Sequence, residues 1–196
     1  MCDDQPDEFL AGALAGGVDL VQLRMKDASD EKIVTAGRRF ASAAADHGAL
    51  FILNDRPDLV AATGADGVHV GQDDAPVADA RAIVGSERIV GLSTHSPAQV
   101  DAASGAGVDY IGVGPVHETP TKPGRPAVGL DLVRYATAHA SVPFFAIGGG
   151  SPASVAAVRE AGATRIAVVR ALSEAPDVEH AARTLRTAIA GEVHVG

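Results

Sequence analysis

The chain has 196 residues, of which 46% are hydrophobic and 21% are charged, a composition typical of one globular domain with a substantial core. The net charge of −9 argues against a broad nucleic-acid-binding surface, and no apolar run reaches the length of a membrane span. Cys2 is the single cysteine, so no intramolecular disulfide can form. We therefore expect one soluble, cytoplasmic domain over residues 1–196 that binds neither nucleic acid nor membranes.

Short apolar runs rich in β-branched residues alternate along the chain with alanine-rich segments of helical character. The runs expected to form strands are Leu20–Arg24, Leu50–Asn54, Gly67–Val70, Ile89–Ser93, Tyr110–Val113, Phe144–Ile147 and Arg165–Val169. The segments expected to form helices are Asp7–Ala15, Asp30–His47, Asp58–Thr63, Pro76–Val84, Pro97–Ala106, Leu130–His139, Pro152–Ala161 and Val178–Ala190. Strict alternation of this kind predicts a parallel sheet covered by helices.

A weak internal repeat indicates how the sheet is closed. Several helices end in a glycine-containing turn that leads into the next strand, as at Thr63-Gly64-Ala65-Asp66 and Ala161-Gly162-Ala163-Thr164. The repeat favours a barrel over an open sheet, so the expected fold class is α/β, a (β/α)8 TIM barrel. The residues before Asp7 are too few and too polar for an eighth strand. The barrel is therefore expected to lack most of strand 1, with the chain shortened at its N-terminus.

Polar residues gather where the predicted strands end, which is where a barrel places its functional groups. Gln22, Arg24 and Lys26 alternate at the end of the first strand, so they share one face of an extended segment. Two cations pointing into a barrel mouth need an anion close by. The alternative is a solvated strand end with Lys26 outside.

Two carboxylates follow neighbouring strands. Asp55 lies in Asn54-Asp55-Arg56-Pro57, which is equally a good turn and helix-start sequence. Asp74 closes Gly71-Gln72-Asp73-Asp74 after the next strand. One carboxylate from each strand end can share Mg²⁺, which in such sites also takes substrate phosphates and water.

The fourth predicted strand ends at Ser93, whose hydroxyl can hydrogen-bond a ligand, although no activating base is evident from the spacing. His69, His95 and His117, taken singly, are each more often structural than functional.

A long loop follows the strand that begins at Tyr110. It carries the hydroxyls of Thr119 and Thr121 and the ammonium group of Lys122, between Pro120 and Pro123. A loop of this length after a core strand is either functional or an ordinary solvated crossover.

Glycines at 148–150 follow the next strand and lead into a helix, and a turn follows Val169 at the last strand. In a barrel this pair of turns holds a phosphate with backbone N–H groups and a helix N-terminus. The sequence therefore predicts two anion sites facing one mouth, one for a pyrophosphate with Mg²⁺ and one for a monophosphate.

With these motifs in order, the chain resembles the thiamine phosphate synthase family over nearly its whole length. The segments that carry the resemblance are Gln22–Lys26, Asn54-Asp55, His69–Asp74, Gly91-Leu92-Ser93, Gly112–Lys122 and Ala146–Gly149.

The resemblance implies an enzyme that joins 4-amino-5-hydroxymethyl-2-methylpyrimidine diphosphate to thiazole phosphate and releases pyrophosphate by a dissociative route. It implies Mg²⁺ as the cofactor and these two small molecules as the partners, and it leaves open whether the protein is a homo-oligomer. The implied roles are Mg²⁺ binding by Asp55 and Asp74; pyrophosphate binding by Arg24, Lys26, Asn54 and Lys122; pyrimidine contacts by Gln22 and Ser93; phosphate contacts by Thr119 and Thr121; and thiazole phosphate binding by Gly149 and Val169. Catalysis would rest on Lys122, Ser93 and Arg24.

The sequence departs from the family pattern at Arg170, where a small hydroxyl residue is common. Its side chain is expected either to contact the phosphate or to point into solvent. Two alternatives to the synthase remain. One is a relative of the thiazole tautomerase, which as a branch uses a histidine where this chain has Pro115. The other is a non-catalytic thiamine-phosphate-binding protein.

Overall fold

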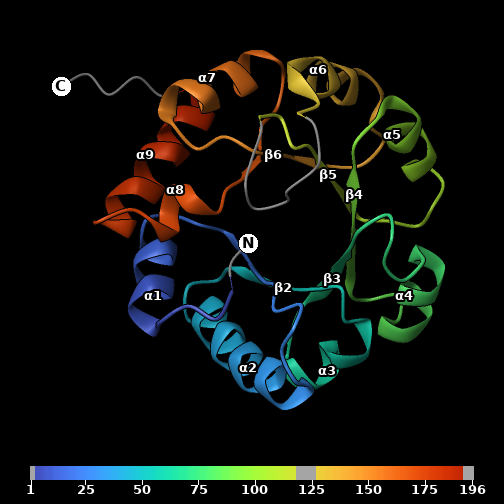
Figure 1. The fold of residues 1–196 in the computed structure, drawn as a ribbon, viewed down its shortest axis with the longest axis vertical. Helices are drawn as coiled ribbons and strands as arrows, with labels where there is room; N and C mark the ends of the chain where they lie inside the picture. The colour runs from blue at the N-terminus through green and yellow to red at the C-terminus, as the bar shows by residue number, and fades with distance from the viewer. Residues whose placement is uncertain (1–2, 118–126, 192–196) are drawn as a thin grey trace.

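The computed structural model describes residues 3–117 and 127–191. Their centre is one curled sheet of parallel strands, in which each strand pairs with its neighbour in the sequence, and helices surround the sheet as an outer ring (Figure 1). The strands are β1 (Leu20–Leu23), β2 (Leu50–Asn54), β3 (Gly67–Val70), β4 (Ile89–Thr94), β5 (Tyr110–Val113), β6 (Phe144–Ile147) and β7 (Ile166–Ala167). The prediction of a parallel α/β fold is confirmed.

Helices connect successive strands and lie on the outside of the sheet. They are α1 (Asp7–Ala15), α2 (Asp30–Asp46), η1 (Pro57–Leu59), α3 (Val60–Thr63), α4 (Val77–Val84), α5 (Pro97–Ala103), α6 (Gly129–His139), α7 (Pro152–Glu160), α8 (Arg170–Ser173) and α9 (Val178–Ala190). Helices α5 and α7 each begin after a serine that is followed by proline, and the Ser96 and Ser151 side chains accept hydrogen bonds from backbone N–H groups of the first turn.

The core lies between the sheet and the helix ring. Phe40 of α2 packs on Phe51 of β2 with 5.7 Å between ring centroids, and both side chains are fully buried. Burying a side chain of this size contributes about 1.5–3 kcal/mol. The buried side chains of the strands are nearly all apolar, as expected for a parallel sheet whose outer face is covered by helices. This packing fixes the strand ends on which the polar residues stand.

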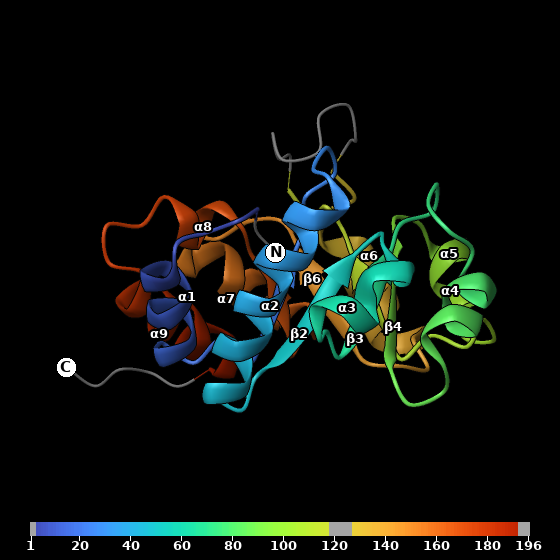
Figure 2. The ribbon, with the colours of Figure 1, turned by 90° about the horizontal axis from the view of Figure 1, so that it is seen from below.

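The sheet does not close on itself within the described residues. There β1 pairs with β2 alone and β7 with β6 alone, so the sheet has two free edges. Helices α1 and α9 pack side by side over the opening between these edges (Figures 1 and 2). Over the described residues, the structure is thus a TIM-like barrel that lacks one strand, as the sequence predicts.

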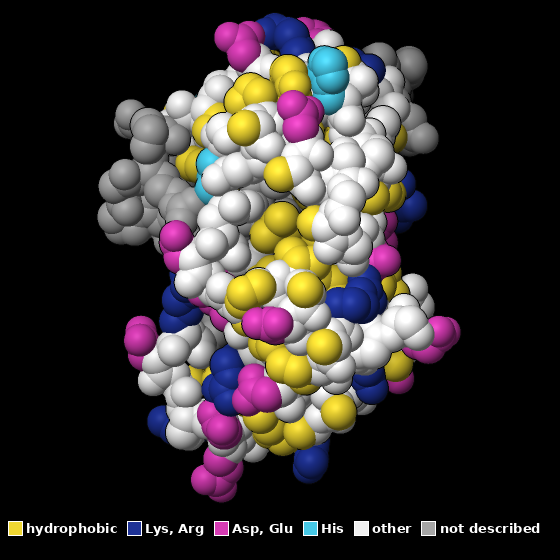
Figure 3. Space-filling view, turned by 90° about the vertical axis from the view of Figure 1, so that its right-hand side faces the viewer, with side chains coloured by type: hydrophobic (Ala, Val, Ile, Leu, Met, Phe, Trp, Pro, Cys, Tyr) yellow, Lys and Arg dark blue, Asp and Glu magenta, His cyan; other side chains and the backbone are white. Residues whose placement is uncertain are grey.

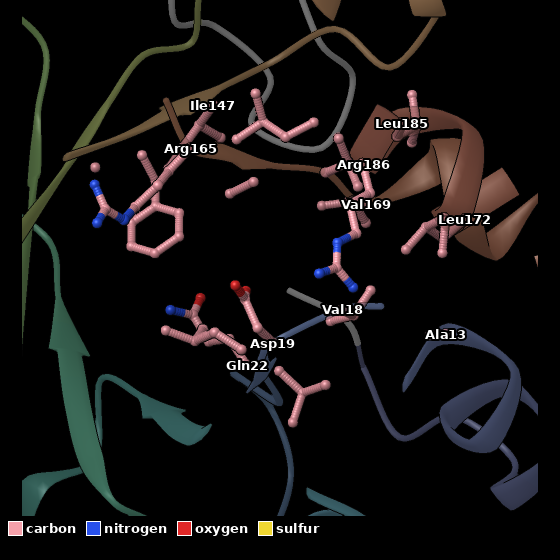
Figure 4. Close-up of a pocket in the computed structure, with 18 of the residues that line it drawn as sticks. Ala13, Val18, Asp19, Gln22, Ile147, Arg165, Val169, Leu172, Leu185 and Arg186 are labelled. Carbon is pink, nitrogen blue, oxygen red and sulfur yellow. The ribbon is translucent and has the colours of Figure 1, made fainter. Parts of the chain in front are cut away.

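A cavity of about 210 Å³ occupies the opening. Figure 4 shows Asp19 and Gln22 on the β1 side of this cavity, opposite Ile147 and Arg165. Its outer wall is largely apolar and is made by α1, α8 and α9, including Ala13, Leu172 and Leu185. We call it the β1–β7 groove.

Several element boundaries differ from those predicted. Strand β7 covers two residues instead of Arg165–Val169, because it has a ladder partner on one side only within the described residues. The four residues of α8 begin at Arg170, after Val168 and Val169, and this helix was not predicted. The predicted helix Asp58–Thr63 is a 3₁₀ turn followed by one α-helical turn, and the predicted helix Pro97–Ala106 ends at Ala103.

Among the described residues, we find no helix with the length and apolar character needed to cross a membrane. On the face of the molecule in Figure 3, Lys and Arg side chains are interspersed with Asp and Glu side chains and do not gather into one broad basic patch.

Candidate active site

Three charged side chains from the ends of β1, β2 and β3 meet in one cluster. The Lys26 ammonium nitrogen lies 3.1 Å from Oδ2 of Asp55 and 3.8 Å from Oδ1 of Asp74. The Lys26 side chain is 46% exposed, so the cluster stands at the mouth and not inside the barrel. The predicted proximity of Asp55 and Asp74 is confirmed, and Lys26 joins them.

Backbone conformation and backbone hydrogen bonds hold the Asp55 and Asp74 carboxylates in position. Asp55 adopts a left-handed conformation with φ of 62°, which is uncommon for a residue other than glycine, and its N–H donates to the His69 carbonyl at 2.8 Å. The Asp74 carboxylate accepts a hydrogen bond from the Gly71 N–H at 2.9 Å, which ties it to the end of β3. Both side chains are therefore held in place before any ligand arrives.

The two carboxylates influence each other electrostatically. Burial raises the pKa of the Asp55 carboxyl above its ordinary value, and hydrogen bonding with Asp74 raises it further. Lys26 opposes this rise but does not cancel it. A divalent cation beside Asp55 would favour the ionised form of this carboxyl more than one ammonium group does.

The chemistry of this cluster fits Mg²⁺. Two hard carboxylate oxygens from adjacent strand ends already surround a cation, here the Lys26 ammonium group. Among the described residues, no group of three or more His, Cys, Asp or Glu side chains forms a complete metal cage. An incomplete set of two carboxylates matches the way Mg²⁺ is usually bound, with phosphate oxygens and water completing the octahedron.

Inside the barrel, the predicted pyrimidine contacts lie together. These two residues, Gln22 and Ser93, line the β1–β7 groove, and Asn54, which was predicted to bind pyrophosphate, lines it as well. His69 and Tyr110 lie between them: His69 Nε2 is 2.9 Å from Ser93 Oγ, and His69 Nδ1 is 2.9 Å from the Tyr110 hydroxyl oxygen. The sequence did not mark Tyr110 as a site residue.

A second cavity, of about 410 Å³, opens beside the first. Gly149, Val169 and Arg170 line it, as predicted for a phosphate cup, and Ser93 lines it as well as the first cavity. Gly149 has φ of 93°, and a Cβ added there would lie 2.8 Å from Cδ2 of His117. The glycine is therefore required both by the backbone and by the space.

Two further groups belong to this cup. The Ser154 side chain accepts a hydrogen bond from the Gly150 N–H at 3.1 Å and so braces the glycine turn. Arg170 has its Nη1 4.0 Å from Glu174 Oε1 and its side chain is 49% exposed. Its guanidinium group thus stands at the rim of the cup, beside an acidic partner.

Four predicted site residues remain, and the structure describes only one of them, Arg24. Arg24 follows β1 and is partly buried. Thr119, Thr121 and Lys122 lie outside the described residues, so their roles stay predictions.

Comparison with known proteins agrees with these features. The family model described as thiamine monophosphate synthase matches residues 1–172. The chain is 52% identical over 180 residues to the thiamine-phosphate synthase of Thermus thermophilus, covering 91% of this chain and 86% of the relative. It is 52% identical over 176 residues to that of Acidothermus cellulolyticus, covering 89% and 83%.

Solved structures give the same result. Thiamine phosphate pyrophosphorylase from Pyrococcus furiosus superposes with a TM-score of 0.89 at 30% identity, covering 97% of this chain and 94% of that one. A 3-hexulose-6-phosphate synthase superposes with a TM-score of 0.69 at 22% identity, covering 96% and 95%, which shows a shared fold alone. The chain belongs to the thiamine monophosphate synthase family and is an enzyme of this kind, a transferase of thiamine biosynthesis.

Proposed function

We propose that this enzyme joins 4-amino-5-hydroxymethyl-2-methylpyrimidine diphosphate to thiazole phosphate by a dissociative reaction assisted by Mg²⁺. The carbon–oxygen bond to the diphosphate breaks first and leaves a pyrimidine methylene cation with free pyrophosphate. The thiazole nitrogen then supplies the electron pair for the new carbon–nitrogen bond. Such a route needs stabilisation of the leaving group and orientation of two substrates, and it needs no strong base.

The observation that carries this proposal is the cluster of Lys26 with Asp55 and Asp74. It places two carboxylates and an ammonium group at the mouth of the barrel, at the ends of three adjacent strands. When bound, Mg²⁺ would neutralise negative charge on the leaving pyrophosphate. Lys26, with Arg24 and Asn54 on the neighbouring strand ends, would then bind the pyrophosphate oxygens.

The two cavities supply the orientation. Gln22 and Ser93 would hold the pyrimidine ring in the inner end of the β1–β7 groove, and Gly149 with the backbone at Val169 would hold the thiazole phosphate. Ser93 borders both cavities, which supports a reaction in which two substrates meet beside it. Thr119, Thr121 and Lys122, on the sequence alone, would complete the diphosphate site from the loop after β5.

Residue 115 favours the synthase over a tautomerase-like relative. Pro115 lines the second cavity, and its side chain has no group that can accept a proton. Asn54, Asp55 and Asp74 would also have no evident use in an isomerisation of the thiazole alone. No observation supports a non-catalytic binding protein over an enzyme.

A coupled assay of pyrophosphate release tests the proposal. The purified chain is mixed with both substrates, with each substrate alone, and with both substrates in excess chelator. We expect pyrophosphate and thiamine phosphate in equal amounts only when both substrates and Mg²⁺ are present. Isomerisation of the thiazole without pyrophosphate release would instead identify a tautomerase, and binding without turnover would identify a binding protein.

A further inference from the structure

Two aspartates hold the start of the neighbouring strand in the same way. Asp66, directly before β3, donates its backbone N–H to the Phe51 carbonyl at 2.8 Å, and its carboxylate accepts the Phe51 N–H at 2.8 Å. Asp109, directly before β5, holds Val90 through the same two bonds, at 2.8 and 2.7 Å. In each case the residue held is the second residue of the preceding strand. One aspartate thus satisfies both backbone groups of one strand residue, an arrangement that we call the aspartate clamp.

Asp19 stands at the corresponding place before β1. It closes the sequence Gly17-Val18-Asp19, which repeats as Gly64-Ala65-Asp66 and Gly107-Val108-Asp109, and the glycine has a positive φ in all three copies. The Asp19 carbonyl accepts the Leu50 N–H at 2.9 Å, just as the Asp66 carbonyl accepts the Ile89 N–H at 3.0 Å. Asp19 therefore has the same register toward the next strand as Asp66 has.

The other half of the clamp at Asp19 is unused. Among the described residues, neither the backbone N–H nor the carboxylate of Asp19 has a hydrogen-bond partner. Asp19 lines the β1–β7 groove, and Figure 4 shows its carboxylate directed into the cavity. The two groups that would hold a strand residue are therefore present on the side where, over the described part of the chain, β1 has no partner strand.

The groove fits an extended peptide better than other occupants. Helices α1 and α9 lie side by side over the opening (Figures 1 and 2), so a folded second copy cannot bring its own edge strand between β1 and β7. The helix wall is largely apolar and suits the outward side chains of a strand. At the strand-start end, the groove presents the Asp19 carboxylate together with the guanidinium groups of Arg165 and Arg186. Acceptors and donors in one place complement the N–H and C=O groups of a peptide backbone.

We propose that the β1–β7 groove is a binding site for a partner peptide in extended conformation, which runs parallel to β1 and whose second residue is held by the Asp19 clamp. The N–H of that residue donates to the Asp19 carboxylate, and its carbonyl accepts the Asp19 N–H, as Phe51 does at Asp66. Ladder bonds to β1 and β7 supply affinity that does not depend on sequence, and alternate side chains pack on the apolar wall. The clamp lies at the start of β1, so the peptide approaches the sheet from the end opposite to the charged cluster of the candidate active site.

Thermal melts of the peptide-free protein test the unused clamp. Asp66→Ala removes the acceptor of the Phe51 N–H and should lower Tm by about 2 °C or more. Asp19→Ala removes a carboxylate that holds nothing and should change Tm by less than about 1 °C. An equal loss in the two variants would show that Asp19 is already bonded within the chain, and this would overturn the proposal.

Calorimetric titration with synthetic peptides tests the binding site. The probe is acetyl-Thr-Val-Leu-Ile-Thr-amide, and its analogue has a methyl group on the backbone nitrogen of the valine, the second residue. Methylation should weaken binding to the unaltered protein about tenfold. Asp19→Ala should bind the probe about tenfold more weakly than the unaltered protein does, and methylation should then cost little more. Asp66→Ala is the matched control and should keep the full preference for the unmethylated probe.

Two results would overturn the site. One is the absence of binding, and the other is an equal effect of methylation in the unaltered protein and in Asp19→Ala. Sedimentation of the same samples tests a second copy as the occupant. We expect the peptide to leave the oligomeric state of the chain unchanged, whereas a dimer that the peptide dissociates would assign the groove to a second copy and contradict the proposal.

Discussion

The Nζ atom of Lys26 lies 3.1 Å from Oδ2 of Asp55, so an ammonium group stands between the ends of β1 and β2 beside a second carboxylate, Asp74. A lysine in this position neutralises the two acids only in part, because the pKa of Asp55 remains raised. The cluster therefore has both the ligands and the electrostatic reason to take up a divalent cation. The first two predictions follow from this arrangement.

Asp55→Asn should lower turnover at least tenfold, which corresponds to about 1.4 kcal/mol or more of lost barrier stabilisation. The substitution removes one negative ligand from the proposed Mg²⁺ site and keeps the size of the side chain. The rate of pyrophosphate release at saturating substrate and Mg²⁺ measures the effect. Asp46→Asn, on the exposed surface of α2, is the control and should have full activity. Full activity of Asp55→Asn in excess chelator would remove the metal assignment.

The same substitution should stabilise the metal-free protein at neutral pH. The folded state raises the pKa of Asp55 above its ordinary value of 3.8, so ionised Asp55 opposes folding once the pH is above that raised value. An asparagine side chain has no charge and tolerates the left-handed backbone at this position. Thermal melts in chelator should show Asp55→Asn about 2 °C or more above the unaltered protein at pH 7–8. The gap should shrink as the pH falls and vanish below 3.8, and a gap that widens in acid would contradict this account.

Gly149→Ala should damage the phosphate cup selectively. A Cβ there would lie 2.8 Å from His117 Cδ2 and 3.0 Å from Ser154 Oγ, on a backbone with φ of 93°. Strain of about 1–2 kcal/mol and the lost space should raise the KM for thiazole phosphate about tenfold, with little change for the pyrimidine substrate. Gly107→Ala is the control for backbone strain, since φ is 78° there and nothing lies within 4 Å of the added Cβ. Equal increases for both substrates would argue against a selective cup.

The free edges of β1 and β7 predict that an added strand stabilises the barrel. We would fuse a five-residue apolar segment ahead of Cys2 and compare it with a Gly-Ser extension of equal length. The apolar segment can pair with both edges and cover the apolar wall of the β1–β7 groove, where each buried side chain contributes about 1.5–3 kcal/mol. Its melting temperature should exceed that of the Gly-Ser version by about 4 °C or more. Identical melting curves would mean that the groove accepts no strand.

The sequence was informative wherever local pattern decides the structure. Strands β5 and β6 match their predicted bounds, because each is a short apolar run flanked by turn residues. The length of β7 was overestimated, because a strand's extent depends on its ladder partners, which lie far away in the sequence. The meeting of Asp55 and Asp74 was predictable from adjacent strand ends alone.

The buried hydrogen bonds of His69 with Tyr110 and Ser93 were not predictable in the same way. They depend on the register of three strands, which places His69 opposite Gly91 and Gly91 opposite Tyr110. Taken singly, His69 reads as a structural histidine and Tyr110 as a core aromatic. The signal in the sequence was Gly91, a glycine inside a strand, which indicates that a large side chain approaches closely.

The most direct test of the metal–pyrophosphate site is anomalous diffraction from crystals grown with Mn²⁺ and pyrophosphate. We predict one anomalous peak bridging a carboxylate oxygen of Asp55 and one of Asp74, at the short distances typical of octahedral oxygen ligands. Lys26 should have left the carboxylates for the pyrophosphate oxygens. A peak elsewhere, or Lys26 still bonded to both carboxylates with pyrophosphate bound, would contradict the account.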